Sequence, residues 1–217
     1  MARAQRRLML SGMASVAEGR PARQLLGAPT ADFQSLLGAT VVGFSVLYLL
    51  SDLIELAQGG FSTGQLAVTY VSEAAIPLFV LGLYAVQRPA IGRLGLLGAT
   101  AYAYTFVFFT STVSYAFLQH TPDWETLKDQ MGAWITVHSL VMVVAGLAFG
   151  FAVLRAGVLP GWTGVLLMAG MASMVIASVL PDGVQTAAAG VRDIAFAAMG
   201  ATLLRPSRTI AGRRRGD

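Results

Sequence analysis

Six stretches of the chain are apolar over roughly 20 residues each, and short polar or glycine-rich segments separate them. These stretches cover residues 36–57, 66–86, 94–118, 131–154, 160–180 and 186–204. A helix rises about 1.5 Å per residue, so each stretch is close to the length that crosses a hydrocarbon layer of about 30 Å. The pattern therefore predicts an all-α fold, a six-helix transmembrane bundle.

Polar residues mark the connections and both ends of the chain. The bundle is expected to occupy residues 34–205, between a basic tail at 1–33 and a second basic tail at 206–217. The first tail is predicted to be disordered or to lie on the membrane surface, because its apolar stretch is too short and interrupted for a signal peptide. Residues 120–130 are predicted to form the most polar loop.

The basic residues predict the orientation of the bundle. Both tails, the 88–93 turn and Arg155 fall on one side, which collects 13 of the 15 Lys and Arg residues; the exceptions are Lys128 and Arg192. Lys and Arg concentrate in cytoplasmic segments of membrane proteins. Both termini are therefore predicted to be cytoplasmic, in a multi-pass protein of a cytoplasmic (inner) membrane.

Composition supports a membrane protein and excludes several other classes. The 217 residues are 55% hydrophobic and 12% charged, against about 25% charged in soluble domains. The net charge of +4 comes from arginines at the ends of apolar stretches, which favours a lipid bilayer over nucleic acid as the partner. The sequence contains no cysteine, which excludes disulfides and thiolate sites. It contains only two histidines, too few to favour a metal or haem site, so neither a metal nor a cofactor is predicted.

A few ionisable residues interrupt the apolar stretches. Glu73, with Pro77 one turn later, and His138 each lie seven residues from the outer start of their stretch, about 10 Å deep. Arg192 and Asp193 lie slightly shallower. Ionisable residues at membrane depth usually face a bundle interior or a wet cavity. We therefore expect these side chains to meet at one level in the outer third of the membrane.

Three functional hypotheses follow from this layer. The leading one is an outward-facing pocket that binds or moves a small apolar or amphipathic ligand, or protons. Its polar contacts would be Glu73, His138, Arg192, Asp193, Asp52 and Glu55, and its apolar walls Tyr115, Trp134 and Phe108.

Two alternatives remain open. One is an intramembrane acid–base enzyme, a cyclase or isomerase on a lipid-like or isoprenoid substrate, with Glu73 or Asp193 as its candidate catalytic acid. The other is a structural subunit in which the same residues form an ion-pair network that fixes helix register.

Small residues suggest how the helices pack. Gly146 and Gly150 form a GxxxG pair, which either packs within the chain or mediates a homo-oligomer. The sequence Leu-Leu-Gly-Ala-Thr occurs at 36–40 and again at 96–100. This repeat raises the hypothesis that the bundle consists of three related helical hairpins.

Two segments carry a resemblance to other proteins: Leu154-Arg-Ala-Gly-Val-Leu-Pro-Gly-Trp162, ahead of a glycine-rich stretch, and Val71-Ser-Glu-Ala-Ala-Ile-Pro77. From Leu36 to Leu204 the chain resembles the small six-span membrane proteins of unknown function that are common in actinobacteria and related bacteria. The resemblance implies six helices in a cytoplasmic membrane. It implies no activity and no catalytic residues.

Overall fold

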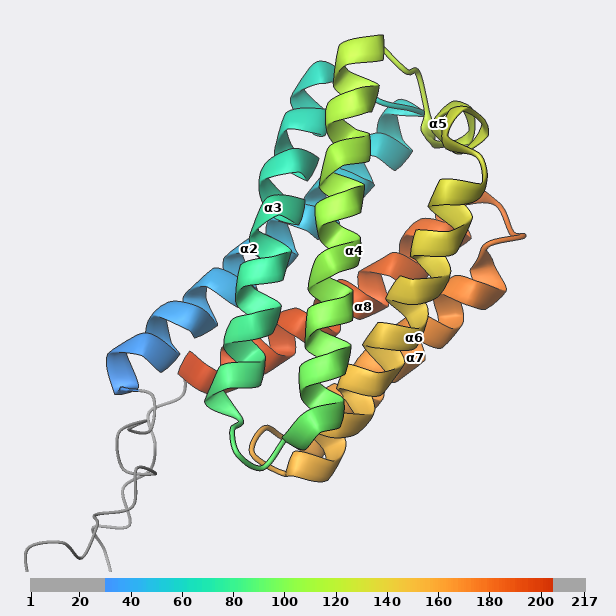
Figure 1. The fold of residues 1–217 in the computed structure, drawn as a ribbon. Coiled ribbons are helices and arrows are strands. Elements are labelled where there is room, and N and C mark those ends of the chain that lie inside the picture. Colours follow the sequence, from blue (N-terminus) through green and yellow to red (C-terminus); the bar gives the residue numbers. More distant parts are fainter. Residues whose placement is uncertain (1–29, 205–217) are drawn as a thin grey trace, which may run out of the picture.

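The computed structural model describes residues 30–204, and this part of the chain is entirely helical apart from its turns (Figure 1). Its helices are α2 (Ala31–Gln58), α3 (Thr63–Val86), α4 (Gly92–Gln119), α5 (Trp124–Met131), α6 (Ala133–Ala156), α7 (Gly161–Ala177) and α8 (Asp182–Leu204). The predicted tails at 1–33 and 206–217 fall almost wholly outside the described residues. Residues 31–33, expected in the first tail, belong to α2.

The six larger helices form a ring in chain order. α2 packs on α3, α3 on α4, α4 on α6, α6 on α7, α7 on α8, and α8 closes the ring against α2. In Figure 1, α2 and α8 run obliquely behind α3 and α4, and the start of α2 lies near the end of α8. Neighbouring helices are antiparallel, so the ring has one interior and two ends.

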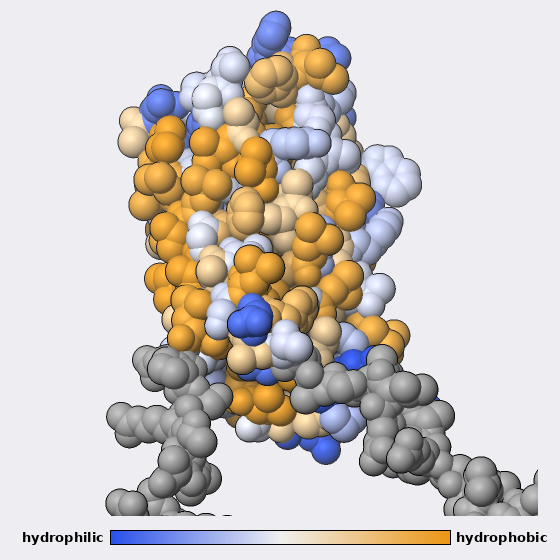
Figure 2. All heavy atoms as spheres, turned by 90° about the vertical axis from the view of Figure 1, so that its left-hand side faces the viewer, coloured by the Kyte–Doolittle hydropathy of each residue, from blue (hydrophilic) through white to orange (hydrophobic). Residues whose placement is uncertain are grey.

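Five helices of the described chain, α2, α3, α4, α6 and α8, are long and apolar enough to cross a membrane. Helix α7 has 17 residues and is shorter than the predicted stretch at 160–180, because the chain turns after Ala177. Hydrophobic residues cover most of the face in Figure 2, and hydrophilic residues gather toward its two ends. This distribution is that of a helical bundle embedded in a membrane.

The polar loop predicted at residues 120–130 contains a helix, α5. The Asp123 side chain starts it by accepting a hydrogen bond from the Thr126 backbone N–H at 2.8 Å, and Leu127 is buried against the bundle. That N–H holds the pKa of the Asp123 carboxyl below its usual range. The prediction missed α5 because eight residues with one buried leucine form no apolar stretch.

One end of the ring interior is filled with aromatic side chains. The rings of Phe79 and Phe196 lie 5.5 Å apart, and Tyr102 lies 5.6 Å from Phe196 and 5.1 Å from Phe106. Met171 and Met199 are fully buried in the same cluster. These contacts join α3, α4, α7 and α8, so the half of the bundle that contains the chain ends has a solid core.

The glycine pair at 146 and 150 packs within the chain. A Cβ added to Gly150 would lie 2.8 Å from the Gly164 carbonyl oxygen, and one added to Gly146 would lie 2.5 Å from the Met171 sulfur. Both glycines are buried against α7. The alternative of a homo-oligomer through this pair would need a surface that α7 already covers.

The two copies of the Leu-Leu-Gly-Ala-Thr repeat pack differently. Gly38 of the first copy faces Gly200 of α8, whereas Gly98 of the second copy faces Phe149 of α6. Three equivalent hairpins would be α2–α3, α4–α6 and α7–α8. The helix that faces Gly98 then belongs to the same hairpin as Gly98, whereas the helix that faces Gly38 belongs to a different hairpin. Both copies of the repeat thus lie at close helix contacts, but the contact of the first copy is between hairpins and that of the second copy is within a hairpin.

Candidate functional site

Glu73 lies on the inner face of α3 and is only 4% exposed. Its Oε1 accepts a hydrogen bond from the Tyr48 hydroxyl of α2 at 2.8 Å. Its Oε2 is buried and has no hydrogen-bond partner among the described residues. Burying a carboxylate oxygen without a partner is costly, so this atom calls for a proton, a water molecule or a ligand.

Arg192 approaches the same level from α8 and is 3% exposed. Its Nε donates to Asp193 Oδ1 at 2.8 Å, and its guanidinium carbon lies 4.8 Å from the centre of the Tyr48 ring and 5.7 Å from that of Phe106. Such contacts with aromatic faces stabilise a cation in a dry environment. Its Nη2 atom is nevertheless buried without a hydrogen-bond partner in the described chain.

A cavity of about 420 Å³ lies beside both groups. It is lined at its deep end by Tyr48, Glu73, Phe106 and Arg192, and at its other end by the α2–α3 turn and the start of α5. Glu125 and Gly59, both at that second end, are exposed to solvent. The cavity therefore extends from the loop end of the bundle to the middle of the ring.

Glu73, Arg192 and Tyr48 lie at matching positions along their helices. Glu73 is ten residues into α3, which begins at Thr63, and Arg192 is ten residues into α8, which begins at Asp182. Tyr48 is likewise ten residues before the end of α2 at Gln58. The depth of this layer in the membrane, expected in the outer third, stays a prediction; the helices themselves begin at polar residues ahead of the apolar stretches, as at the N-cap Ser62.

Of four other predicted site residues, two line the cavity and two do not. Asp52 and Glu55 line the cavity wall above Tyr48 on α2. Asp193 is buried beside Arg192 but is not part of the lining, and its Oδ2 lacks a hydrogen-bond partner within residues 30–204. Tyr115 lies outside the lining, where it packs against the small apolar cluster under α5.

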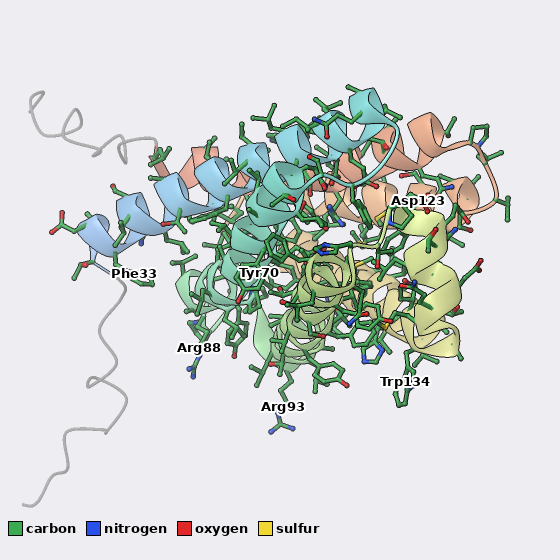
Figure 3. All side chains as sticks on the ribbon, turned by 90° about the horizontal axis from the view of Figure 1, so that it is seen from above. Phe33, Tyr70, Arg88, Arg93, Asp123 and Trp134 are labelled. Atoms are coloured by element: carbon green, nitrogen blue, oxygen red, sulfur yellow. The ribbon has the colours of Figure 1, made fainter. Side chains whose placement is uncertain are left out.

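His138 lies away from Glu73 and Arg192. Its Nδ1 is 2.8 Å from the Trp134 carbonyl oxygen, its Nε2 is 3.2 Å from the Tyr104 hydroxyl, and its ring stacks on Phe108 at 3.6 Å. Trp134 is 67% exposed and points away from the bundle in Figure 3. The expectation that His138, Phe108 and Trp134 form the cavity is therefore corrected: they make a separate cluster between α4 and α6.

A polar network between α2 and α3 was not predicted. The Gln65 side-chain nitrogen donates to Thr69 Oγ1 at 3.0 Å and to Glu55 Oε2 at 3.2 Å, and the Ser51 and Thr69 hydroxyls are hydrogen-bonded to each other. Gln65, Thr69 and Glu73 are spaced four residues apart, a spacing that puts them on one helix face. That spacing was the available signal for a polar wall on α3.

The apolar walls come from residues that the sequence analysis did not select. They include Phe61, Phe106, Phe109, Trp124, Met142 and Met174. In the described residues, no group of three or more His, Cys, Asp or Glu side chains could hold a metal ion. The site is thus a mixed aromatic and carboxylate cavity with a buried arginine at its base.

Comparison with known proteins finds no matching family model, no matching curated protein and no matching solved structure. The resemblance to small bacterial membrane proteins accordingly rests on the two sequence segments alone.

Proposed function

We propose that this chain is a multi-pass protein of a bacterial cytoplasmic membrane, with both termini cytoplasmic, and that its outward-facing cavity binds a small ligand. The observation that carries the proposal is the pair of buried, unpartnered atoms at the deep end of the cavity, Glu73 Oε2 and Arg192 Nη2. A molecule bound at this end, directly or through a water molecule, would compensate these atoms for the hydrogen bonds that their burial has removed.

The cavity supports binding over a purely structural role. A network that only fixes helix register is most stable when its polar atoms satisfy one another in a packed layer. Here the volume of about 420 Å³ lies within the range of about 300–1,000 Å³ that is typical of small-molecule sites. The polar network at Gln65 already links α2 to α3, so register does not depend on leaving Glu73 Oε2 without a partner.

The cavity mouth supports a ligand that arrives from water. Glu55, Asp123 and Glu125 line this end, and a lipid-like substrate would have to pass these carboxylates. The aromatic core around Phe79, Tyr102 and Phe196 fills the opposite half, so the proposal concerns binding and not passage across the membrane.

A pair of cysteine variants tests whether the cavity is open to water from outside. The chain has no cysteine, so a single introduced thiol reports alone. Ala189 lines the cavity on α8, whereas Ala187 is exposed on the outer surface of the same helix. In right-side-out vesicles, we expect Ala189→Cys to react with a membrane-impermeant thiol reagent and Ala187→Cys to react at least about tenfold more slowly, because thiolates form in water and not in lipid.

Inverted vesicles supply the control for orientation, because there Ala189→Cys should be protected until the membrane is opened by detergent. Equal reactivity of the two cysteines, or reaction of Ala189→Cys from the inner side only, would refute the outward-facing cavity.

A further inference from the structure

The charge of the cavity lining indicates what kind of ligand it accepts. Five carboxylates line it: Asp52, Glu55, Glu73, Asp123 and Glu125. Among the described lining residues the single cation is Arg192, and its Nε is paired with Asp193. Glu125 is paired with Lys128 at 2.6 Å at the exposed rim. Deeper in the cavity, Asp52 and Glu73 together outnumber the one described cation, which Asp193 already pairs, and negative charge at this level attracts cations and repels anions.

Arg192 does not offer an open anion site. Its guanidinium is held between Asp193 on one side and the rings of Tyr48 and Phe106 on the other. An anion that reached its Nη2 atom would also lie beside Glu73 and Asp52, in a region of low dielectric where like charges repel strongly. A neutral oxygen or a water molecule satisfies Nη2 without that repulsion.

The walls require an organic body on the ligand. Phe109, Met142 and Met174 line the cavity together with Phe106 and Trp124. A metal ion would gain nothing from these surfaces, and no described cluster of three or more His, Asp or Glu residues is present to hold one. Aromatic faces do bind ammonium groups, as the position of Arg192 over Tyr48 illustrates in this chain.

We propose, as an extension of the proposed function, that the ligand is a monovalent organic ammonium ion with a compact apolar body. Its positive charge lies against Glu73 Oε2, the unpartnered acceptor at the deep end. Its body lies along the apolar wall formed by Phe109, Met142 and Met174. Charge neutralisation at Glu73 and burial of the body then act together, and neither an anion nor an uncharged analogue obtains both.

The test uses protection of the cavity cysteine by defined probes. Ala189→Cys in vesicles of neutral phosphatidylcholine is treated with an uncharged, membrane-impermeant thiol reagent in the presence of benzyltrimethylammonium, benzyl alcohol or phenylacetate. We expect benzyltrimethylammonium to slow the reaction about tenfold at about ten times its Kd. Benzyl alcohol and phenylacetate, which carry the same ring with no charge or with negative charge, should leave the rate within about twofold.

A matched pair of carboxylate variants locates the charge. In the Ala189→Cys background, Glu73→Gln should raise the Kd of benzyltrimethylammonium at least about 30-fold, because it removes a buried counter-ion. Asp129→Asn makes the same acid-to-amide change on an exposed residue at the same end and outside the lining, and should leave the Kd within about twofold. Asp52→Asn is a second cavity variant, with an intermediate expected loss, in case Glu73→Gln does not fold.

The outcomes separate the two proposals. If Ala189→Cys does not react from outside, the outward-facing cavity itself is refuted. If it reacts but benzyltrimethylammonium does not protect it at millimolar concentration, or phenylacetate protects it equally well, the ammonium ligand is overturned and the cavity stands. Equal loss of protection in Glu73→Gln and Asp129→Asn would also overturn the ammonium proposal, because it would assign the effect to surface charge.

Discussion

Glu73 is held by a single described hydrogen bond, from Tyr48 on the neighbouring helix. The phenol lies between the carboxylate and the guanidinium of Arg192, so it contacts both charged groups at the base of the cavity. Tyr48 thereby fixes the direction in which Glu73 Oε2 points. This one hydrogen bond therefore decides whether Glu73 Oε2 is presented to the cavity or packed into the core.

Removing the Tyr48 hydroxyl should cost stability. Tyr48→Phe leaves Glu73 Oε1 without its donor, and we expect a loss of about 1–2 kcal/mol in the free energy of unfolding. Tyr70→Phe is the matched control, because Tyr70 lies on α3, the helix that carries Glu73, and its side chain is 46% exposed. Reversible unfolding in mixed detergent micelles measures both variants. A loss below about 0.5 kcal/mol for Tyr48→Phe would contradict the assigned hydrogen bond.

Individual residues were predicted with uneven success, and the reason is geometric. Glu73 and Arg192 were selected because a charge inside an apolar stretch must turn toward the protein. The same rule selected His138, whose ring instead uses both nitrogens on Trp134 and Tyr104. Helix α6 is apolar on every side, so its sequence contains no stripe that identifies which face points to the ring interior.

Element positions followed from the sequence more closely than side-chain directions did. Each apolar stretch corresponds to one helix, because backbone groups in an apolar setting must be paired within a helix. The helix ends were displaced by several residues where a cap precedes the apolar stretch, as at Ser62 and Thr30. That displacement places Glu73 ten residues into α3, whereas it lies seven residues into its apolar stretch.

Close packing of α6 on α7 depends on glycine at position 164. A Cβ there would lie 2.5 Å from the Gly150 carbonyl oxygen and 3.0 Å from the Leu154 nitrogen, and neither backbone atom can move without shifting its helix. We expect Gly164→Ala to lower the free energy of unfolding by about 1–3 kcal/mol. Thermal unfolding of the purified protein measures this loss.

The matched control is Gly43→Ala on α2, where an added Cβ meets no atom within 4 Å. That variant should be neutral or more stable by about 0.5–1 kcal/mol, because alanine loses less backbone entropy than glycine in a helix. An unchanged stability of Gly164→Ala would show that α6 and α7 do not pack as closely as described.

At the scale of the whole molecule, the ring explains why the cavity lies at the loop end of the bundle. Antiparallel packing brings the start of α2 and the end of α8 together at one end of the bundle, where the aromatic core fills the interior. The other end carries the turn after α2 and the short helix α5, which leave the cavity between them. The exposed residues Arg88 after α3, Arg93 in the first turn of α4 and Arg155 in the last turn of α6 belong to the first end, and acidic residues accompany α5 at the second. Under the positive-inside rule, this distribution supports the proposed outward direction of the cavity.

Helix α7 decides whether the bundle crosses the membrane six times. Its 17 residues extend about 26 Å, slightly less than a hydrocarbon layer of about 30 Å, so local thinning or the flanking residues must supply the difference. Val158 and Val179 flank α7 and are 51% and 87% exposed, so Val158→Cys and Val179→Cys form a matched pair across it. In intact cells, we expect an impermeant thiol reagent to label Val179→Cys fully and Val158→Cys only after the membrane is opened. Labelling of both cysteines from the same side would mean that α7 does not cross the membrane. The start of α2 and the end of α8 would then lie on opposite sides of the membrane, which conflicts with the close contact of Gly38 with Gly200.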